Sequence, residues 1–251
     1  MWFLLIPQIY LALYWECLTL QDHLDPTPSN PQKIRVFSQN VYLLTDLVSD
    51  DSEEKMDSIL KQIEGSDIVM LQEVWTLFSR GRRTRLVERA KKLGFPYSIG
   101  SKCHTLCDGM LLILSRYPIQ GGTYTFKAKS GIEHFLSKGI VWASLDSPCP
   151  MYFFNTHLQA YGEDEVRLRQ VEEIRKFIGD KPGVLAGDFN LNASDLNLGR
   201  NPIPPIPTWG DQGGEAYELL DFIFLLNRSG QGSVERLPYS DHSALRADVW
   251  C

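Results

Sequence analysis

The segment Val184-Leu185-Ala186-Gly187-Asp188-Phe189-Asn190 joins a short apolar run to a cluster of polar side chains. An apolar run bounded in this way predicts a buried strand over Val184–Gly187. Gly187 permits tight backbone geometry, and an acid and an amide two residues apart point to the same side of the chain. Asp188 can then orient an attacking water, and Asn190 can donate to a phosphate oxygen. For this segment alone, an ordinary Asp/Asn turn is the alternative.

The same placement recurs elsewhere, with polar side chains at the end of, or just after, a predicted apolar strand. The further clusters are Gln39-Asn40, Gln72-Glu73, Asn155-Thr156-His157 and Ser240-Asp241-His242. Strand ends present rigidly positioned side chains to a cleft. Each cluster alone has a solvated strand end as its alternative, but together the clusters predict one polar site.

The residue types in these clusters suit metal-assisted proton transfer. Glu73 follows an apolar strand, and a hard cation such as Mg²⁺ favours a carboxylate oxygen, with Asn40 as a neutral oxygen donor. His242 and His157 are candidates for proton transfer near neutral pH. Asp221 can accept from the imidazole of His242 and fix its tautomer. The other histidines, His23, His104 and His134, are interpreted as structural.

Short apolar runs alternate with helical patterns from Lys33 onward, and no internal repeat interrupts them. The predicted strands are Ile34–Gln39, Ile68–Gln72, Met110–Ser115, Gly139–Leu145, Met151–Thr156, Val184–Gly187, Phe222–Leu226 and Ala244–Val249. The predicted helices carry the stripes Met56, Ile59, Leu60, Ile63 after the caps Asp51 and Ser52; Leu86, Ala90, Leu93 before Gly94; and Glu163–Ile178. These elements predict one α/β domain built as a two-sheet sandwich with helices outside.

The chain divides into three parts by composition. Residues 1–20 are strongly apolar and are interpreted as a signal, an anchor or an interfacial helix. Residues 21–32 form a proline-rich connector. The catalytic domain is expected over residues 33–251.

The charge balance bounds the class of substrate. Lys and Arg total 25 against 31 Asp and Glu, which gives a net charge of −6 and a pI near 5.4. No global positive field is available to hold a polyanion, which weighs against duplex nucleic acid. A local basic cleft can nevertheless coexist with an acidic average.

The five cysteines give no zinc signal. Cys17, Cys103, Cys107, Cys149 and Cys251 include no CxxC pair. In an exported chain Cys103 and Cys107 could close a small loop, whereas in a reducing cytosol all five are expected as free thiols. The disulfide state is left open.

Taken together, the motifs resemble the endonuclease/exonuclease/phosphatase superfamily, in the correct order over Lys33 to Trp250. They are Leu71-Gln72-Glu73-Val74-Trp75, Asn155-Thr156-His157-Leu158-Gln159-Ala160, Gly187-Asp188-Phe189-Asn190, Leu220-Asp221-Phe222-Ile223-Phe224 and Ser240-Asp241-His242-Ser243-Ala244. Within it, Asp108-Gly109, Ile113 to Ile119, Ser137-Lys138-Gly139, and Arg167 with Gln170 look like the neutral sphingomyelinase branch. Lys138-Gly139 can also be a charged strand start.

This resemblance implies a four-layer α/β sandwich with two mostly antiparallel sheets flanked by helices, and a Mg²⁺ cofactor for which Mn²⁺ can substitute. It implies that the metal is held mainly by Glu73, assisted by Asn40 and Asp241, and that His242 is the general base oriented by Asp221. It further implies that His157 and Asn190 hold the phosphate, that Asp188 positions water and that Lys138 approaches the substrate phosphate. Two features depart from the branch: residues 197–214 are short and rich in proline and glycine, and no exposed aromatic hairpin for membrane insertion is evident.

The favoured hypothesis is a metal-dependent phosphodiesterase that hydrolyses sphingomyelin to ceramide and phosphocholine by in-line attack of water. One alternative is a deoxyribonuclease-like or AP-endonuclease-like nuclease, with phosphates bound by Arg80, Arg82, Arg83 and Arg85; we interpret that run as a solvated helix start. Another is a phosphoinositide phosphatase. A non-catalytic binding module is the third hypothesis, and it predicts loss of a catalytic side chain, which the sequence does not show.

The expected partner is a phosphodiester substrate in a membrane lipid, with contact to a membrane surface and nucleic acid less favoured. The expected location is secreted or membrane-associated. The oligomeric state is left open.

Overall fold

The computed structural model describes residues 33–43, 52–75, 81–101, 109–191, 196–212 and 214–251. The predicted N-terminal segment 1–20 and connector 21–32 lie outside these residues. So do Cys17, Cys103, Cys107, His23 and His104, together with Arg80, the capping candidate Asp51 and Asp108.

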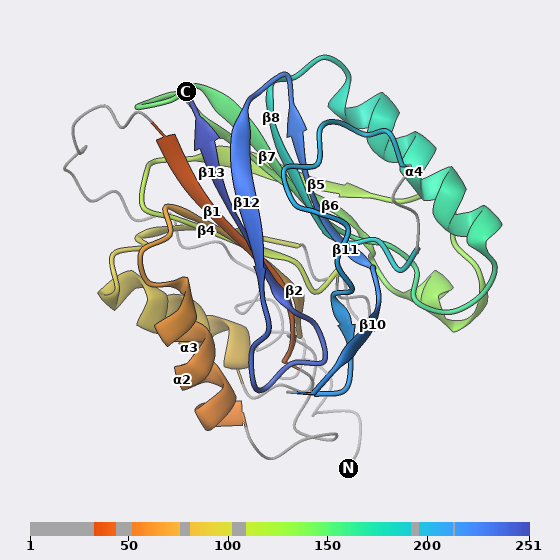
Figure 1. Cartoon of the computed structure of the whole chain (residues 1–251), viewed down its shortest axis with the longest axis horizontal. Helices are drawn as coiled ribbons and strands as arrows, with labels where there is room; N and C mark the ends of the chain where they lie inside the picture. The colour runs from red at the N-terminus through yellow and green to blue at the C-terminus, as the bar shows by residue number, and fades with distance from the viewer. Residues whose placement is uncertain (1–32, 44–51, 76–80, 102–108, 192–195, 213) are drawn as a thin grey trace, which may run out of the picture.

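Two large sheets form the centre of the domain (Figure 1). The six-stranded sheet has the order β12-β13-β1-β2-β4-β3, and the five-stranded sheet has the order β11-β8-β7-β6-β5. A two-stranded sheet pairs β10 with β9. The bounds are β1 Lys33–Leu43, β2 Ile68–Val74, β3 Tyr97–Gly100, β4 Leu112–Ser115, β5 Gln120–Thr125, β6 Gly139–Leu145, β7 Met151–His157, β8 Gly183–Asp188, β9 Trp209–Gly210, β10 Ala216–Glu218, β11 Asp221–Leu226, β12 Gly230–Glu235 and β13 Ala244–Trp250.

Helices cover the outer faces of both sheets. The helices α2 (Ser52–Ile63) and α3 (Arg82–Lys92) lie on one side and α4 (Asp164–Ile178) on the other (Figure 1). A short 3-10 turn, η1 (Gly131–Phe135), lies between β5 and β6. The order helix, sheet, sheet, helix confirms the predicted four-layer α/β sandwich.

Three buried apolar clusters hold these layers together. The largest lies between the two sheets, where residues such as Met70 and Ile113 of one sheet share a core with Phe153 and Ile223 of the other. A second cluster lies beneath α2 and α3, and a third beneath α4 contains the stacked and edge-on rings of Phe189, Phe222 and Phe224. The predicted stripes on all three helices are core, as their spacing indicated.

Two strand pairs are parallel and the others are antiparallel. β1 pairs with β2 in parallel near the middle of one sheet, and β7 pairs with β8 in parallel in the other. The carboxyl ends of parallel neighbours meet at one edge of a sheet. Each parallel pair has an antiparallel neighbour, β13 or β11, that begins at that same edge. Six strands therefore bring their polar ends to one edge of the sandwich.

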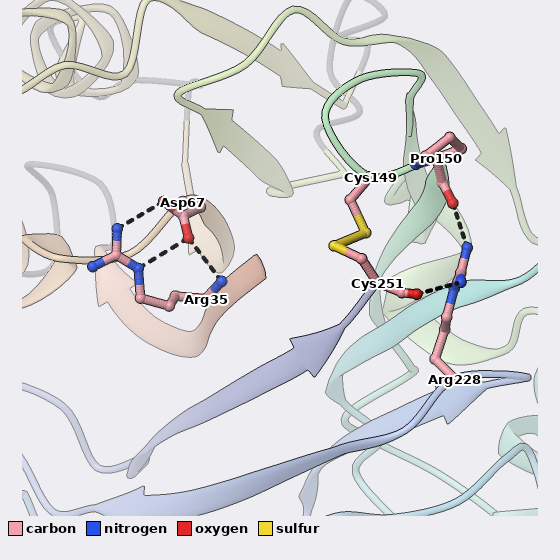
Figure 2. The surroundings of a disulfide bond; sticks show 6 residues. All are labelled: Arg35, Asp67, Cys149, Pro150, Arg228 and Cys251. Atoms are coloured by element: carbon pink, nitrogen blue, oxygen red, sulfur yellow. Dashed lines mark hydrogen bonds and ion pairs between the residues drawn. A yellow bond between two sulfur atoms is a disulfide. The ribbon is translucent and has the colours of Figure 1, made fainter. Parts of the chain in front are cut away.

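The C-terminus is tied to the β6–β7 connection by a disulfide between Cys149 and Cys251, with 5.5 Å between their Cα atoms (Figure 2). Arg228 lies beside the bond and donates to the carbonyl oxygens of Pro150 and Cys251. The cross-link spans 102 residues and so restricts the unfolded chain strongly.

Arg82 and Arg83 at the start of α3 are not solvated, which corrects that interpretation for these two residues. Arg82 is only 1 % exposed. Arg83 donates to the carbonyl oxygen of Ser101 at 2.8 Å, and Arg85 forms an ion pair with Glu53 of α2 at 3.3 Å. Arg82 and Arg83 lie against the domain because long side chains can bury their apolar stems. Arg85 and Glu53 stay at the surface, with 40% and 62% of their side chains exposed.

Within the described part of the chain, the longest helix has 15 residues, and none of the helices is both long and apolar enough to cross a bilayer.

Glu173 of α4 fastens the helix to the end of β5. Its carboxylate accepts hydrogen bonds from the Tyr124 hydroxyl at 2.6 Å and from the backbone N–H groups of Lys127 and Ala128 at 2.9 and 2.8 Å. Burial tends to raise the pKa of Glu173, but these hydrogen bonds outweigh burial and lower it. The ionised carboxylate is therefore the form that holds this contact.

We expect Glu173→Gln to lower the free energy of unfolding at pH 7 by about 1–2 kcal/mol, because hydrogen bonds to a charged acceptor are lost. Since the folded pKa lies below the unfolded one, this contribution is complete above the unfolded pKa of about 4.3 and disappears as the pH falls through the folded value. Urea unfolding at pH 7 and at pH 3.5 measures the difference. Glu172→Gln, which removes an exposed ion pair with Arg175, is the control and should change stability by at most about 0.5 kcal/mol. An equal effect of both variants at pH 7 would contradict the assignment.

Candidate active site

The polar strand ends converge at one edge of the sandwich. Asn40 comes from β1, Glu73 from β2, His157 from β7 and Asp188 from β8. The first residue of β11, Asp221, and the residues just before β13, Asp241 and His242, come from the antiparallel neighbours. Asn40, Glu73, His157 and Asp188 come from strands that have neighbours on both sides, whereas Asp221 comes from the edge strand β11.

Irregular backbone in β1 and β2 directs the side chains of Asn40 and Glu73 into the site. The β1–β2 register shifts between Asn40 and Leu43, and Tyr42 and Glu73 have φ angles of 47° and 58°. Asn190, two residues after β8, has a φ of 47°. Non-glycine residues rarely adopt this left-handed conformation, and such strain gathers at functional sites. Both strands extend beyond their predicted ends at Gln39 and Gln72, so Asn40 and Glu73 lie within the strands and not just after them.

Gly187 brings β8 close to β7. Its φ is 150°, and a Cβ atom at this position would lie 1.9 Å from the carbonyl oxygen of Thr156. Only glycine allows that approach, and the next pair in register is His157 beside Asp188. The His157 Nε2 atom and the Asp188 Oδ2 atom are 3.5 Å apart as a result.

His242 is oriented by Asp221. Its Nδ1 atom lies 2.8 Å from Asp221 Oδ2, so the ring carries a proton on Nδ1 and directs Nε2 into the site. Nε2 lies 3.7 Å from Asp188 Oδ2. The Ser240 hydroxyl accepts from the backbone N–H of His242 and donates to the carbonyl oxygen of Asn40, which fixes the loop against β1.

Thr208 fixes the backbone around the Asp221–His242 pair. It is fully buried, and its hydroxyl accepts the backbone N–H groups of Leu220 and Asp221 at 3.1 and 3.0 Å. Its carbonyl oxygen accepts the N–H of Ser243. Thr208 therefore holds the start of β11 and the start of β13 in one arrangement.

Asn40 lies between the carboxylates. Its Nδ2 atom donates to Glu73 Oε1 and Asp188 Oδ2, both at 3.0 Å, and lies 3.4 Å from His242 Nε2. Its Oδ1 atom accepts from the backbone N–H of Tyr42. The amide thus contacts the acids through its nitrogen, and service as an oxygen ligand would require the amide to turn over.

Lys138 and His157 form the opposite wall of the site. The Lys138 ammonium donates to the carbonyl oxygen of Leu158 at 2.7 Å and lies 3.2 Å from His157 Nε2. It also forms an ion pair with Glu133 of η1 at 3.0 Å, with both side chains buried. Its one unambiguous donated hydrogen bond goes to the Leu158 carbonyl oxygen, and its charge is paired with Glu133, so a phosphate oxygen at Lys138 would share the ammonium group with these partners.

Asp241 lies beside the cluster, with one carboxylate oxygen in use. Its Oδ2 atom accepts from Trp209 Nε1 at 3.1 Å. Its Oδ1 atom is buried, and no donor in the described residues reaches it. A buried carboxylate oxygen without a donor suits a cation, because leaving it unpaired is costly.

The electrostatics of the site reflect burial of several acids together. Burial raises the pKa of Asp188, and the nearby Asp221 carboxylate raises it further. Burial tends to lower the pKa of His242, but the carboxylates of Asp221 and Asp188 outweigh burial and raise it. Burial also raises the pKa of Glu73. For His157, burial and the adjacent Lys138 lower the pKa well below its usual value, so this imidazole is neutral.

The donor set fits a divalent cation. Glu73, His157 and Asp188 offer ligand atoms within 4.8 Å of one another, as do Asp188, Asp221 and His242. Two carboxylates with an adjacent amide and the unpaired oxygen of Asp241 are an oxygen-rich set of the kind that Mg²⁺ and Mn²⁺ prefer. The two groups share Asp188.

The structure brings all of the predicted site residues to this one edge, although their individual roles stay predictions. Asn190 is at the rim, where its Nδ2 donates to the carbonyl oxygen of Leu158. Sequence reasoning missed Glu133 and Thr208. Neither has a signal in the sequence, because Glu133 lies in an isolated 3-10 turn and Thr208 in a proline-rich loop.

The sequence of this chain matches the model of a known protein family. The model of the Endonuclease/Exonuclease/phosphatase family matches residues 37–242, a span that contains every residue of the cluster. The chain belongs to this family. Members of the family are metal-dependent phosphoesterases, in agreement with the acidic and histidine ligand set.

Solved structures of similar fold include sphingomyelinases. Sphingomyelinase C from Streptomyces griseocarneus is 18% identical with a TM-score of 0.73, covering 88% of this chain and 99% of that one. Beta toxin from Staphylococcus aureus, solved as a mutant with bound magnesium ions, is 21% identical with a TM-score of 0.73, covering 86% and 99%. A family member from Beutenbergia cavernae is 18% identical with a TM-score of 0.66, covering 88% and 72%. A comparison with curated proteins gives no match.

We expect Mg²⁺ to raise the melting temperature of this protein and EDTA to reverse the rise. A free ion at a hundred times its dissociation constant stabilises the folded state by about 2.7 kcal/mol. In Glu73→Gln the rise should be largely lost, because one carboxylate is removed without a change of size. Thermal unfolding of each variant with and without Mg²⁺ measures this.

The matched control for that measurement is Glu88→Gln, an exposed acid of α3, which should keep the full rise. The same rise in Glu73→Gln as in the parent would place the ion elsewhere.

Proposed function

We propose that this protein is a Mg²⁺-dependent phosphodiesterase that hydrolyses sphingomyelin to ceramide and phosphocholine. The observation that carries the proposal is the Asp221–His242 pair facing Asp188, Asn40 and Glu73 across one buried edge. A base oriented by a carboxylate, with acids beside it that can hold a cation, is the arrangement that hydrolysis of a phosphodiester requires.

His242 is the group that would take the proton of the attacking water. Asp221 holds its ring and stabilises the imidazolium that proton uptake creates. Asp188, 3.7 Å from His242 Nε2, would orient the water by accepting its second proton in a hydrogen bond. The pair thus fixes the direction from which water approaches phosphorus.

Glu73, Asn40 and Asp241 would hold the ion, with Asp188 nearby. When bound, a divalent ion neutralises charge that develops on the phosphate oxygens, lowers the pKa of water and offsets the negative field that keeps His242 protonated. Mn²⁺ prefers the same oxygen donors and should substitute.

The opposite wall would receive the phosphate. His157 is neutral, and its buried Nδ1 atom has no hydrogen-bond partner in the described part of the chain. Lys138 supplies positive charge beside it, and the Asn190 amide lies near Leu158 at the rim. Donors aimed at an equatorial oxygen stabilise the charge of the transition state.

Three observations favour a lipid over a nucleic acid. Sphingomyelinases are among the proteins of similar fold, and this chain matches 99% of the length of sphingomyelinase C. In the arginine run that could have bound nucleic-acid phosphates, Arg82 is buried and Arg83 donates to the Ser101 carbonyl oxygen within the domain. The net charge of −6 argues in the same direction.

The proposed location is secreted or membrane-associated. The Cys149–Cys251 disulfide supports it, because such bonds form and persist in oxidising compartments. We also propose that residues 33–251 form the catalytic domain.

The substrate is tested with purified full-length protein in one Mg²⁺ buffer. Phosphocholine release from sphingomyelin in detergent micelles is compared with plasmid nicking and with phosphate release from phosphoinositides, each with an EDTA control. We expect EDTA-sensitive phosphocholine release alone. Plasmid nicking without phosphocholine release would identify a nuclease, and no turnover of any substrate would favour a binding module.

His242→Ala should lower the rate of phosphocholine release by about 10²–10⁴-fold, because proton transfer to the base is lost. His242→Gln keeps a polar side chain in this buried place and should lose activity equally while retaining the fold. Asp180→Ala, an exposed acid after α4, is the control and should keep the parental rate. Full activity in His242→Gln would remove the residue from catalysis.

A further inference from the structure

Large apolar side chains are exposed beside the proposed active site. Ile132 and Phe135 of η1 are 77% and 69% exposed, and Tyr161, in the loop that follows β7, is 75% exposed. We call these three residues the apolar rim. In Figure 1, η1 is the short lime-green turn next to the beginning of α4. Exposed apolar groups gathered in this way mark interaction sites more often than isolated ones do.

Buried polar contacts connect the two segments of the rim. Glu133 Oε1 accepts from the backbone N–H groups of Ala160 and Tyr161 at 2.9 and 3.0 Å. The Gln159 side chain accepts from the N–H of Ser130 at 2.8 Å and donates to the Ser130 hydroxyl and the Tyr161 carbonyl oxygen, both at 2.6 Å. The rim is therefore a preformed surface, because its backbone is held from below.

The same contacts connect the rim to the catalytic groups. Glu133 lies between Ile132 and Phe135 in sequence and forms the ion pair with Lys138 inside the site. Tyr161 follows His157 by four residues. The rim thus borders the wall that would receive the phosphate, and whatever binds the rim is presented to that wall.

The charges around the apolar rim indicate which kind of membrane it can bind. Lys127 is exposed and Lys129 is half-buried, and the exposed acids Glu163, Asp164 and Glu165 begin two residues after Tyr161. Asp164 and Glu165 form ion pairs with Arg167 and Arg169 of α4. Charges of the two signs are therefore nearly balanced around the rim, and the chain carries a net charge of −6. Attraction to an anionic membrane is therefore not available, whereas a zwitterionic bilayer imposes no charge requirement.

The shape of the rim also favours a bilayer over a protein partner. Its side chains protrude from two short loops, while a stable protein interface needs a larger, complementary surface. A bilayer interface accepts single aliphatic and aromatic tips, and aromatic rings are favoured there.

We infer that the apolar rim is a docking surface for zwitterionic phospholipid bilayers, in which Ile132, Phe135 and Tyr161 enter the interface and set the active site against the lipid head groups. This inference rests on the proposed function for its purpose, since a membrane lipid must reach the phosphate wall. The docking itself requires no hydrolysis. It can therefore be tested separately.

The experiment measures co-sedimentation of the full-length protein with phosphatidylcholine vesicles, which contain no sphingomyelin. The combined variant Ile132→Ser, Phe135→Ser and Tyr161→Ser should lose at least about tenfold in vesicle affinity, because each apolar side chain contributes to partition into the interface. Trp250→Ser is the matched control, since this exposed aromatic residue ends β13 at the opposite edge of the sandwich, and it should bind like the parent. Phe135→Ser alone, with an intermediate loss, guards against misfolding of the combined variant.

A second readout separates docking from catalysis. On a short-chain sphingomyelin below its micellar concentration, the combined variant should keep the parental rate within about twofold, while its rate on sphingomyelin vesicles falls with binding. If the parent binds vesicles but releases no phosphocholine, and the combined variant loses vesicle binding, the docking surface is upheld and the proposed substrate is rejected. Parental binding by the combined variant, no binding by the parent, or binding that requires phosphatidylserine would overturn the docking inference.

Discussion

The site depends on how several buried carboxylates are balanced by positive charge. Asp188 and Asp221 are almost fully buried around His242, and Glu73 is held across the amide of Asn40. Burying ionised acids together is costly unless cations or donors compensate them. His242 and the Asn40 amide provide part of that compensation, and the raised pKa values of Asp188 and Glu73 show that it is incomplete. The fold therefore creates a demand for a cation at this edge.

The fold meets this constraint through its two parallel strand pairs. β1 with β2, and β7 with β8, deliver side chains from the middle of each sheet, so acids from both sheets can face one another across the inter-sheet core. The antiparallel neighbours β11 and β13 begin where those pairs end, which adds Asp221 and His242. A large apolar core on both sides of each sheet holds this edge against the repulsion of the acids.

The sequence predicted what apolar runs and strand-end motifs can reveal. All eight predicted strands are present within a few residues, because each contains a run that is buried on both faces. The edge strands β3, β5 and β12 and the short pair β9 and β10 were missed. β5 and β12 are largely exposed and carry glycines in place of an apolar run, and β3, β9 and β10 have only two to four residues. The site residues were predicted to meet, whereas Thr208 and Glu133 were not found, because they act through hydrogen bonds with segments distant in the sequence.

Glu133 shows why such a residue matters for the whole edge. One of its oxygens pairs with Lys138, and the other holds the Ala160 and Tyr161 amides. A phosphate oxygen that approaches Lys138 would meet an ammonium group that is already paired with this carboxylate and that donates to the Leu158 carbonyl oxygen. Because Glu133 is also anchored by two backbone amides, it cannot move far without disturbing the loop that carries Tyr161. The Lys138 ammonium group and the backbone of the apolar rim are therefore linked through one buried side chain, Glu133.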